Sequence, residues 1–290
     1  MKSRSARSSR RRISAPNSRR NCANRRTCCA SAWRQIRPDF SWTDVEENGM
    51  HFMVIRRADA ASESADFPAA PLAANLASAV PGARWLHPGS EAARLHRRAG
   101  AWTIEHGPFP AGELAAGFAI IDVPSKEAAI AWALQWPTAD AEGGAVLEVR
   151  ETGCSGGCAG IDTQSPPQLT PYAVLLRSSP GLEADDMPPP EVIARMNARN
   201  AHDAQAGVLL AGDGLKPTAK GARVKFKGGR PTVVDGPFTE IKELIAGFWL
   251  IQAASRADAI AWVESYPFPW PEVSLELRAV AAPPPGPAAH

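Results

Sequence analysis

The chain contains one passage twice, and this internal repeat constrains the fold more than any other feature. Residues 86–109 align without a gap onto residues 215–238, and after a one-residue deletion residues 117–137 align onto 247–267. The second copy is the more regular, and the first is a rougher version of it. The repeat therefore indicates two structural units of one type in a chain of 290 residues, which is long enough for two small cores.

Both copies show the same succession of expected elements. An apolar strand opens each copy, at 51–57 and 172–178, and a helix follows that is shortened in the first copy. Next come a hairpin, whose Gly228-Gly229 pair supplies positive φ angles in the second copy, and a Gly-Pro-Phe turn. A strand, an amphipathic helix and a closing strand complete each copy. Ser125 and Ser255 are the expected N-caps of these helices.

This order predicts an α+β fold of ferredoxin-like units with antiparallel sheets and helices on one side. The helix-free sheet face would be apolar and exposed, so we expect the two units to pack sheet against sheet, as a tandem pseudo-dimer in one chain. The units are expected at 50–152 and 172–282. A linker rich in Gly, Pro and Ser joins them at 153–171, and a disordered Pro-rich tail follows at 283–290.

Charge separates the beginning of the chain from the rest. Residues 1–37 hold 12 of the 32 Lys and Arg residues and no acid, so the other residues hold 20 bases against 30 acids. An acidic body argues against a broad nucleic-acid footprint on it. No apolar run approaches the roughly 20 residues of a membrane span.

Residues 1–49 are expected as a disordered basic tail, because they lack any hydrophobic periodicity. A nucleic-acid-binding arm, an organelle transit peptide and a segment outside the natural protein are the alternatives. We favour the last. The codons for Glu46-Glu47 must be purine-rich, like a bacterial ribosome-binding sequence, and they closely precede Met50, where a strand-like stretch begins.

The sequence gives no support for a cofactor or a metal. Cys154 and Cys158 form a CxxxC pattern without a nearby histidine, which matches neither a zinc set nor a redox CxxC. They are expected as incidental thiols of a cytoplasmic protein. The chain has no P-loop, GxGxxG, HExxH or GxSxG pattern. The Gly-Asp-Gly stretch at Gly212–Gly214 is expected as a turn rather than a phosphate loop.

The second copy closely resembles the YCII-related family, in particular its branch with the Asp-Gly-Pro-Phe (DGPF) motif. The residues that carry the resemblance are Ala206–Val224, Asp235–Gln252 and the helix around Ala259–Trp262. The first copy resembles the family less well, and the two together cover most of residues 50–282. The resemblance implies a dimeric α+β-barrel fold and a protein of unknown reaction. Some relatives are linked to ring dehalogenation, and others are encoded beside alternative sigma factors.

Asp235 and His202 are the candidate catalytic residues. Asp235 opens the DGPF turn, and it is either an acid/base or ligand acceptor in a cleft or a structural turn residue. Family members outside this branch carry a histidine in the first helix that is proposed to pair with an aspartate. The matching region here reads Arg195-Met196, and His202 lies further along, where a surface histidine is the alternative.

Four further residues near the motif are candidate ligand-binding residues: Arg223, Thr239, Glu240 and Lys242. A solvated charged face is the alternative for them. The first copy has His106 in place of the motif aspartate and lacks the Thr-Glu-x-Lys run, so only the second copy is expected to keep the site. Trp249 and Trp262 follow the apolar pattern and are expected in the core.

Two functional hypotheses follow. The first is a small-molecule-binding protein, or a minor enzyme without cofactor, that uses a cleft near Asp235. The second is a non-catalytic regulatory or scaffold module tied to sigma-factor-dependent stress transcription. A closed pocket lined by Asp235, His202 and Arg223 would favour the first hypothesis. A sheet interface filled by apolar side chains, with these residues in water, would favour the second.

Overall fold

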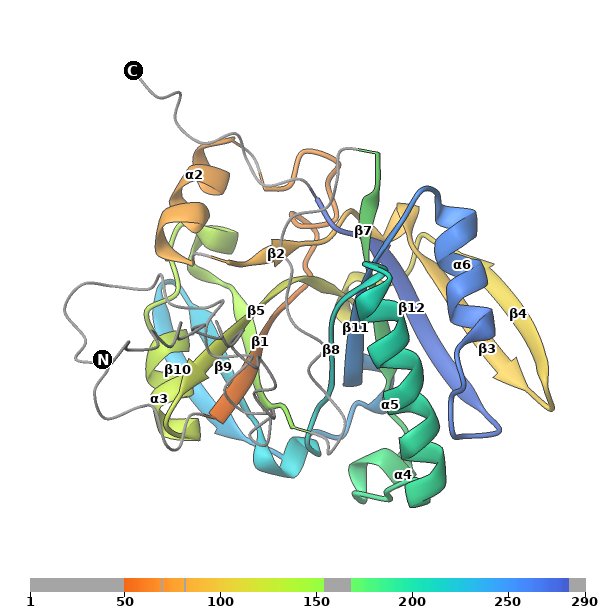
Figure 1. The fold of residues 1–290 in the computed structure, drawn as a ribbon. Helices are drawn as coiled ribbons and strands as arrows, with labels where there is room; N and C mark the ends of the chain where they lie inside the picture. Colours follow the sequence, from red (N-terminus) through yellow and green to blue (C-terminus); the bar gives the residue numbers. More distant parts are fainter. Residues whose placement is uncertain (1–49, 69, 81, 154–167, 282–290) are drawn as a thin grey trace, which may run out of the picture.

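The computed structural model describes residues 50–68, 70–80, 82–153 and 168–281. The expected basic tail, Cys154 and Cys158, most of the expected linker and the Pro-rich end lie outside these residues. Within the described part, the chain forms two six-stranded antiparallel sheets flanked by helices (Figure 1). No helix among the described residues is long and apolar enough to cross a membrane.

The two halves of the chain have strands and main helices in the same order. The first half contains β1 (Met50–Arg57), α2 (Ala70–Ala79), β2 (Arg84–Trp85), η2 (Gly89–Glu91), β3 (Ala93–Arg98), β4 (Ala101–His106), η3 (Ala111–Glu113), β5 (Ala115–Val123), α3 (Lys126–Ala133), η4 (Asp140–Gly143) and β6 (Val146–Glu151). The second half contains β7 (Thr170–Arg177), α4 (Pro180–Glu183), α5 (Pro190–Gln205), β8 (Leu209–Gly214), η5 (Thr218–Lys220), β9 (Ala222–Lys227), β10 (Arg230–Asp235), η6 (Ile241–Glu243), β11 (Ile245–Ala253), α6 (Arg256–Ser265) and β12 (Val273–Ala279).

Each half provides a ferredoxin-like set of four strands, which confirms the α+β class and the antiparallel sheets. The orders are β6-β1-β5-β2 and β12-β7-β11-β8. The expectation of a turn at Gly212–Gly214 was wrong, because these residues end β8 and pair with β11. Glycine and aspartate are poor strand formers, and the pairing with β11 overrides that local preference.

The hairpins cross between the halves. The hairpin β3–β4 of the first half pairs with β12 of the second, and the hairpin β9–β10 of the second half pairs with β6 of the first. Each six-stranded sheet is therefore completed by the other half of the chain. At the two seams, Arg223 lies opposite Glu148 and Arg94 lies opposite Glu276.

An apolar layer fills the space between the two sheets. Its buried side chains come from central strands of both sheets and include Ile55, Phe118, Leu175, Phe248 and Leu250. The rings of Phe118 and Phe248 meet across the layer with centroids 5.9 Å apart. Side chains of the two sheets therefore pack against each other across this layer.

The helices cover the outer faces of the two sheets. Between each sheet and its helices lies a separate apolar core. Side chains of α3 pack on the first sheet, and those of α5 and α6 pack on the second, where Trp249 and Trp262 are buried as expected. The side chains of Ser125 and Ser255 accept hydrogen bonds from backbone amides of the first turn, so both expected N-caps are confirmed.

Candidate functional site

Asp235 and His202 lie in different parts of the molecule. Asp235 ends β10, its side chain is 73% exposed, and its Oδ1 lies 2.7 Å from Nζ of Lys126 at the start of α3. His202 is exposed on α5, which packs on β8 of the other sheet. Figure 1 shows α5 and β10 well apart. The structure does not bring the two residues together as a dyad.

The rest of the DGPF turn has a packing role. The amide of Gly236 donates a hydrogen bond to the carbonyl oxygen of Gly221, at 3.2 Å. A Cβ added at Gly236 would lie 1.8 Å from the carbonyl oxygen of Thr218, so only glycine fits this close backbone approach. Phe238 then places its ring 4.2 Å from the guanidinium carbon of Arg223. The turn thus closes over a buried arginine.

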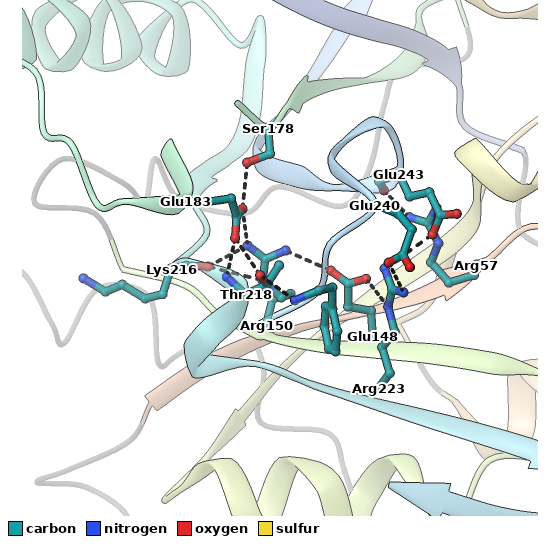
Figure 2. Close-up of polar contacts among 11 residues, drawn as sticks. Arg57, Glu148, Arg150, Ser178, Glu183, Lys216, Thr218, Arg223, Glu240 and Glu243 are labelled. Carbon is teal, nitrogen blue, oxygen red and sulfur yellow. Dashed lines mark hydrogen bonds and ion pairs between the residues drawn. The ribbon is translucent and has the colours of Figure 1, made fainter. Parts of the chain in front are cut away.

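Arg223 is the centre of a buried charge cluster (Figure 2). Its Nε donates a hydrogen bond to Oε2 of Glu148, at 3.1 Å, across the seam between β9 and β6. Its Nη1 and Nη2 lie 3.5 Å from carboxylate oxygens of Glu240 and Glu243. Three carboxylates therefore surround this one guanidinium, and planar forks of this kind bind carboxylates well.

A second arginine continues the cluster inward. Nη1 of Arg150 donates a hydrogen bond to Oε1 of Glu148 at 2.8 Å, and its Nη2 donates one to the carbonyl oxygen of Lys216 at 2.6 Å. Glu183 lies beside it and accepts hydrogen bonds from the amide and hydroxyl of Thr218 and from the hydroxyl of Ser178. Burial opposes the ionisation of Glu183, but these hydrogen bonds outweigh it and lower the pKa of its carboxyl.

Arg57 enters the cluster from β1 of the first half. Its Nη1 donates a hydrogen bond to the carbonyl oxygen of Glu243 at 2.6 Å, and its Nη2 donates one to that of Gly112 at 2.8 Å. Burial lowers the pKa of Arg57, and the charge of Arg223 lowers it further. The cluster is thus assembled from both halves of the chain.

The remaining predicted site residues lie at the solvent side of this cluster. Thr239, Glu240 and Lys242 are exposed on the loop around η6, and the hydroxyl of Thr239 donates a hydrogen bond to Oε1 of Glu240 at 3.2 Å. The structure therefore brings Arg223 and Glu240 into contact. Within this loop only Ile241–Glu243 form a helical turn, the 3-10 turn η6.

The motif did not point to Glu148, Arg150 and Arg57, which form much of the cluster. A signal was present. The pattern Leu-Glu-x-Arg occurs at 147–150 and again at 275–278, on closing strands that are otherwise apolar. Charged residues repeated inside two buried strands indicate paired charges, because an unpaired charge is costly to bury.

The arginines of the cluster are suited to binding charged groups rather than to proton transfer. Guanidinium groups stay protonated and donate from fixed positions. Among the described residues, no three histidine, cysteine, aspartate or glutamate side chains are grouped as a metal site would need. The arrangement can orient a charged ligand at the loop that carries Glu240, with Arg223 as its anchor.

The fold and the site define a class: an α+β protein of two antiparallel sheets, in which a DGPF loop closes over a buried charge cluster. Residues 170–280 match the model of the YCII-related domain. An uncharacterised protein of Rhizobium meliloti (strain 1021) is 36% identical over 83 residues, which cover 28% of this chain and 67% of that protein. The chain belongs to the YCII-related family, through its second half.

Proposed function

We propose that the protein binds a small molecule in the cytoplasm, without a cofactor, at the DGPF loop of its second half. In this proposal the chain is a tandem pseudo-dimer of the dimeric α+β-barrel type, and its first half is a degenerate copy of the same unit. The matching strand orders β6-β1-β5-β2 and β12-β7-β11-β8 support the duplication, as do the reciprocal hairpins.

The buried charge cluster around Arg223 is the observation that carries this proposal. Buried ion pairs contribute little to stability, because desolvation offsets their attraction, and apolar side chains could close the same seam. Groups with perturbed ionisation gather at functional sites more often than elsewhere. The pKa shifts of Arg57 and Glu183, the exposed loop above them and the contribution of both halves all fit a binding site.

Each candidate residue has a distinct role in the proposal. Arg223 anchors a polar group of the ligand, while Glu240 and Lys242 contact it from the loop. Thr239 orients Glu240 through the hydrogen bond between their side chains. Asp235 contributes charge at the edge of the loop. His202 lies on a helix of the other sheet, so we propose no role for it here.

A thermal-shift screen with a panel of small organic acids, amines and sugars tests the proposal. We expect a compound that raises the unfolding temperature of the natural chain and fails to do so with Arg223→Lys, which keeps the charge and loses the planar fork. His106→Asn, at the first-half counterpart of Asp235, is the matched control and should respond like the natural chain. If every compound that stabilises the natural chain stabilises Arg223→Lys equally, the proposed site is contradicted.

One observation favours the scaffold hypothesis instead. The layer between the sheets is filled by apolar side chains, and Asp235 and His202 are exposed, as that hypothesis expects. A regulatory module would recognise a protein of the transcription machinery through its surface. Under this hypothesis no compound would shift the unfolding temperature, and a sigma factor would co-purify with the natural chain at native expression levels.

A further inference from the structure

The first half contains a counterpart of the Arg223 cluster, centred on Arg94. Arg94 lies opposite Glu276 across the second seam, as Arg223 lies opposite Glu148 across the first. Its guanidinium carbon is 4.1 Å from the ring centroid of Phe109, the counterpart of Phe238. Its Nη1 donates a hydrogen bond to Oε2 of Glu113 at 2.7 Å.

The two clusters differ by one carboxylate. Glu240 directly precedes η6 and lies against Arg223. The residue that directly precedes η3 is Pro110, so Arg94 has no equivalent of this third carboxylate. The repeat is one residue shorter at this loop, which is where the acidic side chain is lost.

Arg94 consequently keeps unused donors. Its Nε and Nη2 are buried, and neither has a hydrogen-bond acceptor among the described residues. The carboxylate of Glu276 is 3.5 Å from Nε, and it also lies 3.3 Å from Nη1 of Arg177. Glu113 is likewise shared, 3.7 Å from Nη2 of Arg177. Glu276 also accepts a hydrogen bond from Nη1 of Arg278, at 3.2 Å, so three guanidinium groups share two carboxylates. Leaving buried donors unpaired is unfavourable.

We propose that the first half binds a small monovalent carboxylate at Arg94, and that the ligand takes the position that the side chain of Glu240 holds in the second half. A carboxylate matches the planar donor fork of arginine. A single negative charge is what this cluster lacks relative to the other. Exposed Pro110 marks the solvent side from which the ligand enters.

This proposal is independent of the ligand site in the second half, because it concerns the other loop and the other arginine. The degenerate copy thus has a binding role of its own. In the second half this carboxylate is the side chain of Glu240. In the first half it is a ligand taken from solution. In this proposal, Pro110 in place of a glutamate replaces an internal contact with a contact to the ligand.

Acetate is the probe, and the full chain is the sample. The unfolding temperature is measured against sodium acetate, with sodium chloride keeping the ionic strength and buffer keeping the pH constant. We expect a saturable rise of about 3–5 °C at tenfold over half-saturation. Pro110→Glu should raise the unfolding temperature without acetate and should remove the acetate response. Pro110→Gln, the neutral match, should keep the response.

A reciprocal variant makes the test sharper. Glu240→Gln removes the internal carboxylate of the second half, so it should add a second acetate response at Arg223. Arg94→Gln should abolish the original response, and the Pro110 pair decides the matter if that variant does not fold. An acetate response that is equal in Pro110→Glu and Pro110→Gln would overturn the proposal. So would a natural chain that responds to acetate no more than to chloride.

Discussion

Gly236 illustrates, at the scale of a single residue, why the DGPF motif has its form. A Cβ at this position would lie 1.8 Å from the carbonyl oxygen of Thr218, and its first-half counterpart Gly107 meets Gly89 at the same distance. We expect Gly236→Ala to lower the free energy of unfolding by roughly 2–3 kcal/mol, because the backbone must shift to relieve the overlap. Urea denaturation measures this change.

Gly112→Ala is the matched control for this prediction. A Cβ there meets nothing within 4 Å, so the change should leave stability nearly unaltered. If Gly236→Ala proves as stable as Gly112→Ala, the close approach is not what requires glycine in the motif.

His51 gives the protein a predictable pH dependence. Its Nε2 lies 3.6 Å from Oδ2 of Asp122. The interaction with Asp122 raises the pKa of His51 above its ordinary 6.5, against the opposing effect of burial, and the charge of Asp213 raises it further. A raised folded-state pKa means that this stabilisation is fully present below pH 6.5 and is lost as the pH rises through the folded-state value.

We therefore expect the free energy of unfolding to fall as the pH increases above 6.5, and His51→Gln to flatten this decline. His202→Gln, at an exposed histidine, should leave the decline intact. Denaturant midpoints at a series of pH values provide the measurement. Identical pH profiles for His51→Gln and the natural chain would show that this pair does not titrate as proposed.

At the scale of elements, the sequence was informative wherever local chemistry decides the structure. Ser125 and Ser255 cap their helices, and Gly228 and Gly229 take φ angles of 55° and 75° at the hairpin turn, as expected. The exchange of hairpins could not be predicted in this way. Either closing strand offers the same Leu-Glu-x-Arg pattern, so Arg223 would meet a glutamate in its own half or in the other.

The candidate site likewise has a part that the local sequence predicts and a part that depends on the exchange of hairpins. Arg223 and Glu240 were predicted from the motif and do meet. Their partners Glu148 and Arg57 are distant in sequence, and only the crossed hairpin brings them close. The pairing of His202 with Asp235 could not be judged from the sequence, because it depends on which sheet each element joins.

The seam itself supports a prediction. Glu148 is fully buried and holds both Arg150 and Arg223, so Glu148→Gln leaves two buried guanidinium groups short of a charge partner. We expect a loss of about 3 kcal/mol or more in the free energy of unfolding. Asp235→Asn is the control: its ion pair with Lys126 is exposed, so we expect a loss of about 1 kcal/mol or less. Urea denaturation should separate the two variants, and a loss below about 1 kcal/mol for Glu148→Gln would mean that the seam does not depend on this carboxylate.

At the scale of the whole molecule, the crossed hairpins mean that neither half is complete alone. A fragment of residues 170–282 would lack β3–β4 beside its β12, and its own β9–β10 would have no sheet to join. It would also expose the apolar layer that contains Leu175, Phe248 and Leu250. Two copies can repair both defects by exchanging hairpins, because Arg223 of one copy then faces Glu276 of the other, as Arg94 faces it in the full chain. We expect the fragment to form a homodimer or to be insoluble, whereas the full chain needs no second copy for this purpose. Light scattering coupled to size-exclusion chromatography measures the mass, and a stable, soluble monomer of the fragment would contradict the argument.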